Sequence, residues 1–324
     1  MSAAPPRIPV CVLTGFLGSG KTTLLNRLLR DPAWSDTAVI VNELGEIALD
    51  QELIASSEDN VRVLSSGCLC CTLQGGLRET LADLFVRRVK GAIPKFARVM
   101  VETTGVADPG PVANSVVSDP LLRAEYRFAA IATTVDAMHG AQQLARFPEA
   151  TRQVALADLL VLTKTDLAPA DTLRALLADM NPAATLVERG PAIELFFPAA
   201  GRIDAPGLFS GGGYSGMARP HSRARAMSFV IDHPVHWSGL AAWMARAAEL
   251  FGERLLRVKG IFTIADDGGA VAVHGVGRFF HPPERLGRKG DGASRLVCIG
   301  QDIDEAALAA SLKLLEKEKA THGI

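Results

Sequence analysis

The stretch "VCVLTGFLGSGKTTLLNRLL", residues 10–29, joins an apolar segment to a glycine-rich turn and then to an amphipathic segment. The turn fits the pattern G-x-x-x-x-G-K-[ST], with Gly15 and Gly20 as its glycines and Lys21 and Thr22 at its end. In a strand-turn-helix order, backbone N–H groups and the helix N-terminus converge on one point and attract an anion. The stretch therefore predicts a phosphate-binding loop and a P-loop NTPase fold.

Two side chains of this loop have specific predicted roles. Lys21 would reach the β- and γ-phosphates of a nucleotide, and the Thr22 hydroxyl would be a ligand of Mg²⁺. A glycine-rich turn without a ligand is the alternative, and the flanking strand and helix patterns argue against it. The loop residues expected to contact the nucleotide are Gly15, Gly18, Ser19, Gly20, Lys21, Thr22 and Thr23.

Apolar runs alternate with helix-like segments through the first 200 residues. Buried strands are expected at 10–15, 38–43, 61–66, 97–104, 127–135 and 159–166. This alternation predicts an α/β fold, with a mostly parallel sheet flanked by helices, over residues 1–200.

The chain changes character after this first domain. Residues 201–225 are rich in Gly, Ser and Arg without an apolar period, which predicts a flexible linker. Residues 226–324 show strand-like runs, a hairpin turn at "DDGG" and two amphipathic helices, which predicts a smaller α+β domain. The first of these helices is expected to face inward with Leu240, Trp243, Met244, Ala247, Leu250 and Phe251.

The segment "TKTD", residues 163–166, ends an apolar run and is similar to the N-K-x-D guanine signature of GTPases. The Asp166 carboxylate would accept hydrogen bonds from the two N–H donors of guanine, and the Lys164 stem would lie over the base. Thr163 stands where most GTPases have Asn, so a bridging amide is lost and base selectivity is expected to be looser. A Lys and an Asp in a solvated turn are the alternative interpretation.

Acidic residues follow two other predicted strands. In "VETTG", residues 101–105, Glu102 is placed to hold Mg²⁺ through water, and the backbone of Gly105 would approach the γ-phosphate. The loop "VNELGEIALD", residues 41–50, carries Glu43 as a candidate catalytic acid, with a solvated loop residue as the equal alternative.

Composition excludes several classes of partner. The chain has 34 basic and 35 acidic residues, a formal charge of −1, so no global field favours nucleic acid or an anionic membrane. No apolar run reaches the roughly 18 residues that a membrane span requires, and the N-terminus lacks a secretory pattern. We expect a cytoplasmic protein, in which clustered cysteines are more often metal ligands or redox groups than disulfides.

Three of the five cysteines lie in "SSGCLCCTLQGG", residues 65–76. Adjacent Cα atoms are about 3.8 Å apart, which makes a disulfide between Cys70 and Cys71 unfavourable. Cys68, Cys70 and Cys71 are therefore predicted to bind a metal, with zinc favoured and Co(II) and Fe(II) as alternatives. Cys11 and Cys298 lie in apolar runs and are expected to be inert core residues.

Together these motifs resemble the CobW-type GTPases, metal chaperones related to the GTPases of urease and hydrogenase maturation. The segments that carry the resemblance are "IPVCVLTGFLGSGKTTLLN", "VNELGEIALD", "SSGCLCCTL", "ETTGVADPGP", "TKTDL" and, near the C-terminus, "LLRVKGIFTI", "AVHGV" and "RLVCIG". The family hallmark Gly-Cys-x-Cys-Cys is matched at 67–71. The resemblance also implies Glu46 as a further metal ligand.

The resemblance implies a GTP-dependent metallochaperone that hydrolyses GTP slowly and delivers zinc to a client metalloprotein. Delivery of Co(II) or Fe(II) for cofactor or enzyme maturation is one alternative, and a nucleotide-gated thiol or metal sensor without delivery is another. A small-molecule kinase would use the same phosphate loop and would leave the cysteines without a role. A homodimer that depends on nucleotide or metal is also consistent with the sequence.

Overall fold

The computed structural model describes residues 6–41, 54–58, 61–64, 69–72, 76–188, 192–198 and 224–316. The chain divides into two compact units, the first of residues 1–153, 157–173 and 186–198, the second of 154–156, 174–185 and 199–324. The predicted linker lies outside the described residues except for its last two, which begin strand β10 (Ala224–Ile231). The domain boundaries at 200 and 225 stay predictions.

A nine-stranded sheet organises the first unit, in the order β3-β4-β5-β2-β6-β1-β7-β8-β9. Its strands are β1 (Ile8–Gly15), β2 (Thr37–Val41), β3 (Ile54–Glu58), β4 (Val61–Leu64), β5 (Leu69–Thr72), β6 (Arg98–Glu102), β7 (Tyr126–Asp136), β8 (Leu159–Thr163) and β9 (Thr185–Glu188). The helices of this part of the chain are α1 (Lys21–Leu29), η1 (Pro32–Trp34), α2 (Leu77–Val89), α3 (Pro109–Ser118), α4 (Leu122–Glu125), α5 (Gly140–Arg146), α6 (Pro148–Leu156), α7 (Asp171–Met180) and α8 (Ile193–Phe196). The last three residues of α6 and most of α7 belong to the second unit.

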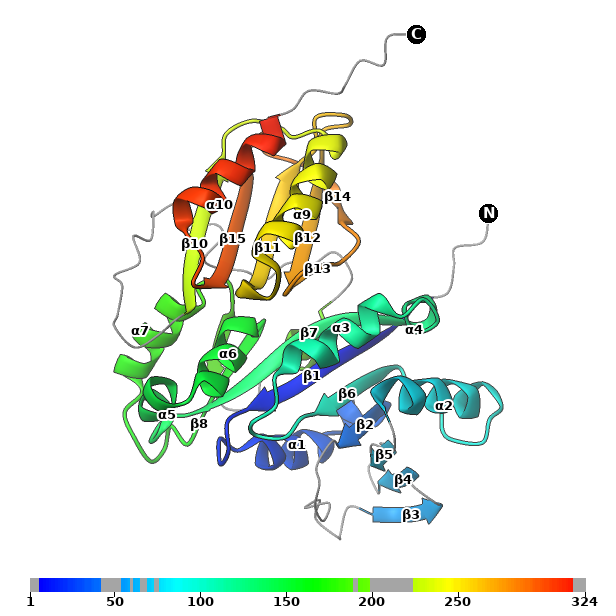
Figure 1. The fold of residues 1–324 in the computed structure, drawn as a ribbon. Helices are drawn as coiled ribbons and strands as arrows, with labels where there is room; N and C mark the ends of the chain where they lie inside the picture. The colour runs from blue at the N-terminus through cyan, green and yellow to red at the C-terminus, as the bar shows by residue number, and fades with distance from the viewer. Residues whose placement is uncertain are drawn as a thin grey trace. The chain divides into compact units, whose positions relative to one another are not determined.

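The strands from β5 to β8 are parallel along the sheet order, and β3 and β4 continue it in antiparallel pairs (Figure 1). The expected fold class is confirmed. The apolar run at 61–66 contains a strand as predicted, β4, but this strand pairs antiparallel to β5. The strand beside β2 in the parallel part is instead β5, residues 69–72, which has no long apolar run to reveal it.

Both faces of this sheet are covered by apolar side chains. Alternate residues of β2 belong to different core clusters, Val39 and Val41 to one and Ala38 and Ile40 to the other. Because successive strand residues point to opposite faces, the two clusters lie on opposite sides of the sheet. Helix α1 packs into the first cluster, and α2, α3 and α4 contribute to the second. The near-continuous apolar runs of the sequence follow from this two-sided burial.

The second unit contains an antiparallel sheet in the order β10-β15-β11-β12-β13, with β14 paired to β12. Its further elements are α9 (Trp237–Phe251), η4 (Gly252–Arg254), β11 (Leu255–Thr263), β12 (Gly269–Val276), β13 (Phe279–Phe280), β14 (Glu284–Lys289), β15 (Ser294–Gln301), α10 (Glu305–Ser311) and η5 (Leu312–Glu316). Helices α9 and α10 share one apolar core with the sheet, and the indole N–H of Trp243 donates to Ser311 Oγ at 3.2 Å. This confirms the expected smaller α+β domain.

Helix α9 departs from expectation at one position. Leu240, Trp243, Ala247 and Phe251 are buried as predicted, but Leu250 is 39% exposed. Leu250 lies three residues after Ala247 and next to Phe251, so it is at the edge of the buried face and not at its centre.

Among the described residues, no helix combines the length and the apolar character needed to cross a membrane.

The two cysteines outside the cluster lie in the cores of the two units. Cys11 and Cys298 are fully buried, and burial raises the pKa of both thiols, with the nearby Asp158 carboxylate adding to the effect at Cys11. The prediction that they are inert core residues agrees with this environment, because a buried neutral thiol is a poor nucleophile.

We expect iodoacetamide to leave Cys11 and Cys298 unmodified in the native protein and to alkylate both in urea. Peptide mass spectrometry gives the modified fraction at each position. Alkylation of either residue under native conditions, at a rate similar to that in urea, would contradict the burial described above.

Candidate nucleotide site

The site lies at the carboxyl ends of four parallel strands. In register, Leu13 of β1 pairs with Glu102 at the end of β6, Gly15 pairs with Thr134 of β7, and Asp136 of β7 pairs with Thr163 of β8. Parallel pairing thus brings "GFLGSGKT", "ETTG", "VDAMH" and "TKTD" to one edge of the sheet. Ligand sites in open α/β sheets lie at this edge.

The phosphate loop is shaped by glycines that no other residue could replace without strain. Gly20 has φ 88° and ends the loop as the N-cap of α1. Gly15 has φ 145°, and a Cβ there would lie 2.6 Å from the Thr134 carbonyl oxygen. Below the loop, Ser19 Oγ and Thr134 Oγ1 are 2.6 Å apart in a buried hydrogen bond. Close backbone approach and positive φ therefore account for the glycine pattern.

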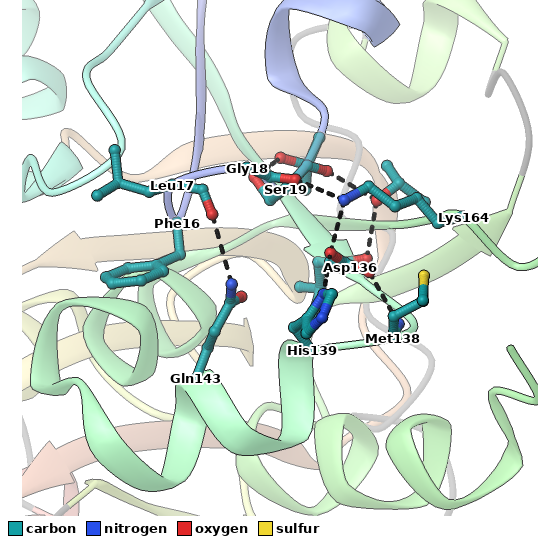
Figure 2. Close-up of polar contacts among 12 residues, drawn as sticks. Phe16, Leu17, Gly18, Ser19, Asp136, Met138, His139, Gln143 and Lys164 are labelled. Atoms are coloured by element: carbon teal, nitrogen blue, oxygen red, sulfur yellow. Dashed lines mark hydrogen bonds and ion pairs between the residues drawn. The ribbon is translucent and has the colours of Figure 1, made fainter. Parts of the chain in front are cut away.

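Side chains from outside the loop hold three successive loop carbonyls. Gln143 Nε2 donates to Leu17 O at 3.4 Å, and Lys164 Nζ donates to Gly18 O at 2.8 Å (Figure 2). Thr163 Oγ1 donates to Ser19 O at 2.7 Å. The C=O and N–H groups of a planar trans peptide point in opposite directions. The three peptides carry the N–H groups of Gly18, Ser19 and Gly20. The Ser19 N–H donates to Phe16 O and closes a turn, and the other two N–H groups are on the side where an anion would bind.

Lys21 and Thr22 begin α1 beside the end of β6. Lys21 is buried, and its Nζ donates to Gly15 O at 2.9 Å, so the ammonium lies against the loop that it would share with a phosphate. Thr22 Oγ1 donates to Glu102 Oε1 at 2.9 Å. A hydroxyl and a carboxylate at this distance form an oxygen donor set suited to Mg²⁺, bound directly or through water.

The turn after β6 is fixed against the phosphate loop from two sides. A Cβ at Gly105 would lie 2.8 Å from Leu17 N, so the two backbones meet closely. The buried Gln153 of α6 donates from Nε2 to Gly105 O at 3.1 Å and to Ala107 O at 3.0 Å. The backbone of Gly105 is therefore adjacent to the loop, where a γ-phosphate sensor is expected.

A cavity of about 540 Å³ opens beside the loop and the end of β8. Its lining includes Thr23, Leu24, Arg27, Lys164, Asp166 and Leu167. The cavity combines an apolar wall, the Lys164 stem and the exposed Asp166 carboxylate. Its volume and its lining groups suit a nucleobase.

Asp136 contacts Lys164 of the cavity lining and was not singled out in the sequence. Its carboxylate accepts from Lys164 Nζ at 2.7 Å, from His139 Nδ1 at 3.1 Å and from the Met138 N–H at 2.8 Å (Figure 2). Burial, the largest influence, raises the pKa of Asp136, but the hydrogen bonds from Lys164, His139 and Met138 together lower it below its usual value. Asp136 is therefore an anion at neutral pH.

The structure brings the predicted nucleotide-site residues together and leaves the metal-site residues only partly described. Thr163 does not simply lose the amide of the usual signature, because its hydroxyl still connects the base motif to Ser19 O. Cys70 and Cys71 lie in β5, whereas Cys68, Glu43 and Glu46 lie outside the described residues. Within the described residues, no three His, Cys, Asp or Glu side chains form a metal-binding group.

Sequence reasoning missed Gln143, Gln153 and Asp136. None belongs to a nucleotide-binding motif used above, and a Gln on a helix gives no signal of its own. Asp136 did carry a usable signal, because it ends an apolar run at 127–135 and so had to lie at the same sheet edge as Glu102 and Asp166.

Comparisons with known proteins cover most of the chain. Residues 9–188 match the CobW/HypB/UreG nucleotide-binding domain, and residues 224–315 match the cobalamin synthesis protein CobW C-terminal domain. The zinc chaperone YjiA of Escherichia coli K12 is 33% identical over 96% of this chain and 99% of its own length. The zinc chaperone CobW of Pseudomonas aeruginosa is 30% identical over 95% of this chain and 91% of its own length.

Solved structures agree with the sequence comparisons. The crystal structure of Zn(II)-bound YjiA GTPase from E. coli matches with a TM-score of 0.72 and 32% identity, and it covers 96% of this chain and all of that one. A Zn(II)-bound triple mutant of YjiA matches with a TM-score of 0.73 at 31% identity. Both comparisons span the two units of the chain.

The hydroxyl of Thr163 supports a direct test of the loop contacts. Thr163→Val removes the donor to Ser19 O without changing the shape of the side chain, so guanine nucleotide affinity should fall about tenfold, about 1.4 kcal/mol. Thr163→Ser keeps the hydroxyl and should stay within about threefold of the natural protein. Titration with a fluorescent GDP analogue measures both, and equal affinities for the Val and Ser variants would contradict a role for this hydrogen bond.

Proposed function

Because this chain belongs to the CobW/HypB/UreG family, we propose that it is a GTPase that binds zinc and delivers it to a client protein. The observation that carries the nucleotide half is the meeting of Lys21, Thr22 and Glu102 at one sheet edge, with Thr22 Oγ1 and Glu102 Oε1 at 2.9 Å. The two similar zinc chaperones support the metal half, since each is similar to this chain over nearly its whole length.

Guanine is the proposed base. The cavity beside the loop places the Lys164 stem and the Asp166 carboxylate on its lining. Asp166 accepts from the N1–H and 2-amino donors of guanine, which adenine does not offer. We propose that Thr163, in place of the usual Asn, holds the base motif against the phosphate loop through its hydroxyl. The preference for GTP over ATP is then less strict than in GTPases that have Asn at this position.

Hydrolysis converts GTP and water into GDP and phosphate. Lys21 supplies a positive charge to the transferring phosphoryl group, and the loop N–H groups and helix N-terminus add to it. Thr22 and Glu102 would hold Mg²⁺, which neutralises phosphate charge when bound. We propose Glu43 as a further catalytic acid and expect slow turnover, because the mechanism rests mainly on charge stabilisation.

The proposed zinc site begins at β5. In parallel register with β2, Cys70 pairs with Val39, Cys71 with Ile40 and Thr72 with Val41. The cysteine strand therefore ends beside the residue at which β2 gives way to the loop that carries Glu43 and Glu46. We propose Cys68, Cys70, Cys71 and Glu46 as zinc ligands, since thiolates and a carboxylate suit this ion.

This proximity suggests how nucleotide and metal are coupled. We propose that GTP draws the 42–50 loop toward the γ-phosphate and that Glu46 then completes the zinc site. By linkage, zinc must strengthen GTP binding by the same factor by which GTP strengthens zinc binding. Hydrolysis would weaken the site and allow transfer to a client metalloprotein in the cytoplasm, with a nucleotide- or metal-dependent homodimer as one form of the complex.

Two related functions fit the same residues. Delivery of Co(II) or Fe(II) would use the same thiolates, and metal competition under anaerobic conditions distinguishes these ions from zinc. A nucleotide-gated metal sensor would bind zinc without releasing it to a client. Transfer of ⁶⁵Zn to an apo-metalloprotein during GTP turnover, but not with GDP, would support delivery.

Substitutions of Lys21 and Asp166 should affect different steps, hydrolysis of GTP and recognition of the base. Lys21→Ala should abolish GTP hydrolysis, because the ammonium at the phosphates is lost. Asp166→Asn should lower the ratio of GTP affinity to ATP affinity. As a control, Asp171→Asn, which replaces the acid at the start of α7, should leave this ratio unchanged. Released phosphate and competition binding give the readouts. Equal affinity of the natural protein for ATP and GTP would refute the guanine assignment.

Zinc affinity should be higher with GTP and Mg²⁺ than with GDP and Mg²⁺. Cys70→Ala or Cys71→Ala should abolish tight binding, and Glu46→Ala should mainly remove the difference between nucleotides. Cys298→Ala, which removes a thiol from the core of the second unit, is the matched control. Because thiolates bind only after losing their protons, affinity should also fall below about pH 7.

A chromophoric zinc chelator in competition measures these affinities. Identical values in the GTP and GDP states would reject the coupling while leaving the zinc site in place. Tight binding by the Cys70→Ala and Cys71→Ala variants would reject the site itself.

A further inference from the structure

Asp136 is not among the residues that line the cavity, yet it is connected to the phosphate loop through one side chain. Its carboxylate is 2% exposed and lies 2.7 Å from Lys164 Nζ. The same ammonium donates to Gly18 O at 2.8 Å. Figure 2 shows Lys164 reaching between these two acceptors, one at the end of β7 and one in the loop.

We propose that Asp136 is a positioning residue for nucleotide binding, which holds Lys164 simultaneously on the phosphate loop and over the base cavity. The inference rests on the proposed guanine nucleotide binding and adds a residue to it. A lysine side chain has a long, freely rotating stem, and a single carbonyl acceptor would hold it weakly. The buried anion supplies the stronger, charge-assisted partner.

The backbone of Lys164 supports this role. Its φ is 56°, in the left-handed region that L side chains rarely adopt. Such a conformation persists only when the surroundings hold it in place. The two hydrogen bonds of its ammonium, together with the Leu167 N–H donating to Lys164 O at 3.0 Å, supply these constraints.

Asp136 is itself held from several sides. The Met138 N–H donates to Oδ1, and His139 Nδ1 lies 3.1 Å from Oδ2, the oxygen that also accepts from Lys164. The carboxylate therefore has two donors besides Lys164 that hold its orientation. Any loss of its charge should act on the loop through Lys164 and not through a change of β7.

The test is a double-mutant cycle with fluorescent mant-GDP and mant-GTP in the presence of Mg²⁺. Asp136→Asn should raise the dissociation constants of both nucleotides about tenfold, because guanine and the loop contacts are common to both. It should raise KM for GTP and leave kcat within about threefold. In a Lys164→Met background, Asp136→Asn should have less than about a twofold further effect, since the path to the loop has been removed.

Asp158→Asn is the matched control for general damage to the sheet. Asp158 directly precedes β8, and its Oδ2 accepts the Ile131 N–H at 2.9 Å. It lies at the end of the β7–β8 pair opposite to Asp136. Its substitution should leave nucleotide affinity within about twofold. Thermal unfolding of every variant separates loss of affinity from loss of fold.

The outcomes distinguish failure of the proposed nucleotide binding from failure of the proposed role of Asp136. Failure of the natural protein to bind either nucleotide would overturn the proposed function. Binding by the natural protein with equal affinity in Asp136→Asn, or an equal effect of Asp136→Asn with and without Lys164, would overturn this inference alone. If Asp136→Asn does not fold, a double variant that binds nucleotide more than about twofold more weakly than Lys164→Met would still overturn the inference, and the double variant removes both partners and so avoids a lone buried charge.

Discussion

Parallel pairing of β1 with β6 and β7, and of β7 with β8, is the constraint on which the site depends. Each pair brings two carboxyl ends to the same edge, so residues separated by more than 140 positions become hydrogen-bonded neighbours, as Lys164 and Gly18 are. Antiparallel pairing would send alternate strand ends to opposite edges. The buried apolar runs that specify a parallel sheet therefore also specify where the polar residues meet.

The fold was largely predictable from the sequence because its signals are local. "GFLGSGKT" needs only a strand before it and a helix after it, and the long apolar runs reveal most strands. β5 was missed because "LCCT" is short and carries no apolar period. The exposure of Leu250 was not foreseen because apolar spacing locates the centre of a buried helix face better than its edge.

The residues of the candidate site were predictable only where a sequence motif gives both the type of side chain and its place at a strand end. Lys21, Thr22, Glu102 and Asp166 follow from spacing and strand ends. Gln143 and Gln153 act through amide hydrogen bonds to backbone carbonyls, and such contacts depend on tertiary packing that no local pattern records. Thr163 departs from the usual Asn of the base motif. Its shorter side chain still connects the motif to the phosphate loop, because its hydroxyl donates to Ser19 O.

The carbonyls of the phosphate loop are all engaged before any phosphate arrives. Leu17, Gly18 and Ser19 accept from one side chain of α5 and from two side chains at and directly after the end of β8, and Gly15 accepts from Lys21. The conformational entropy lost on ordering this loop is thus part of the free energy of folding, and little of it remains to oppose association. Because side chains outside the loop already hold its carbonyls, the loop has the character of a preformed receptor, and the residues that fix its shape lie largely elsewhere in the chain.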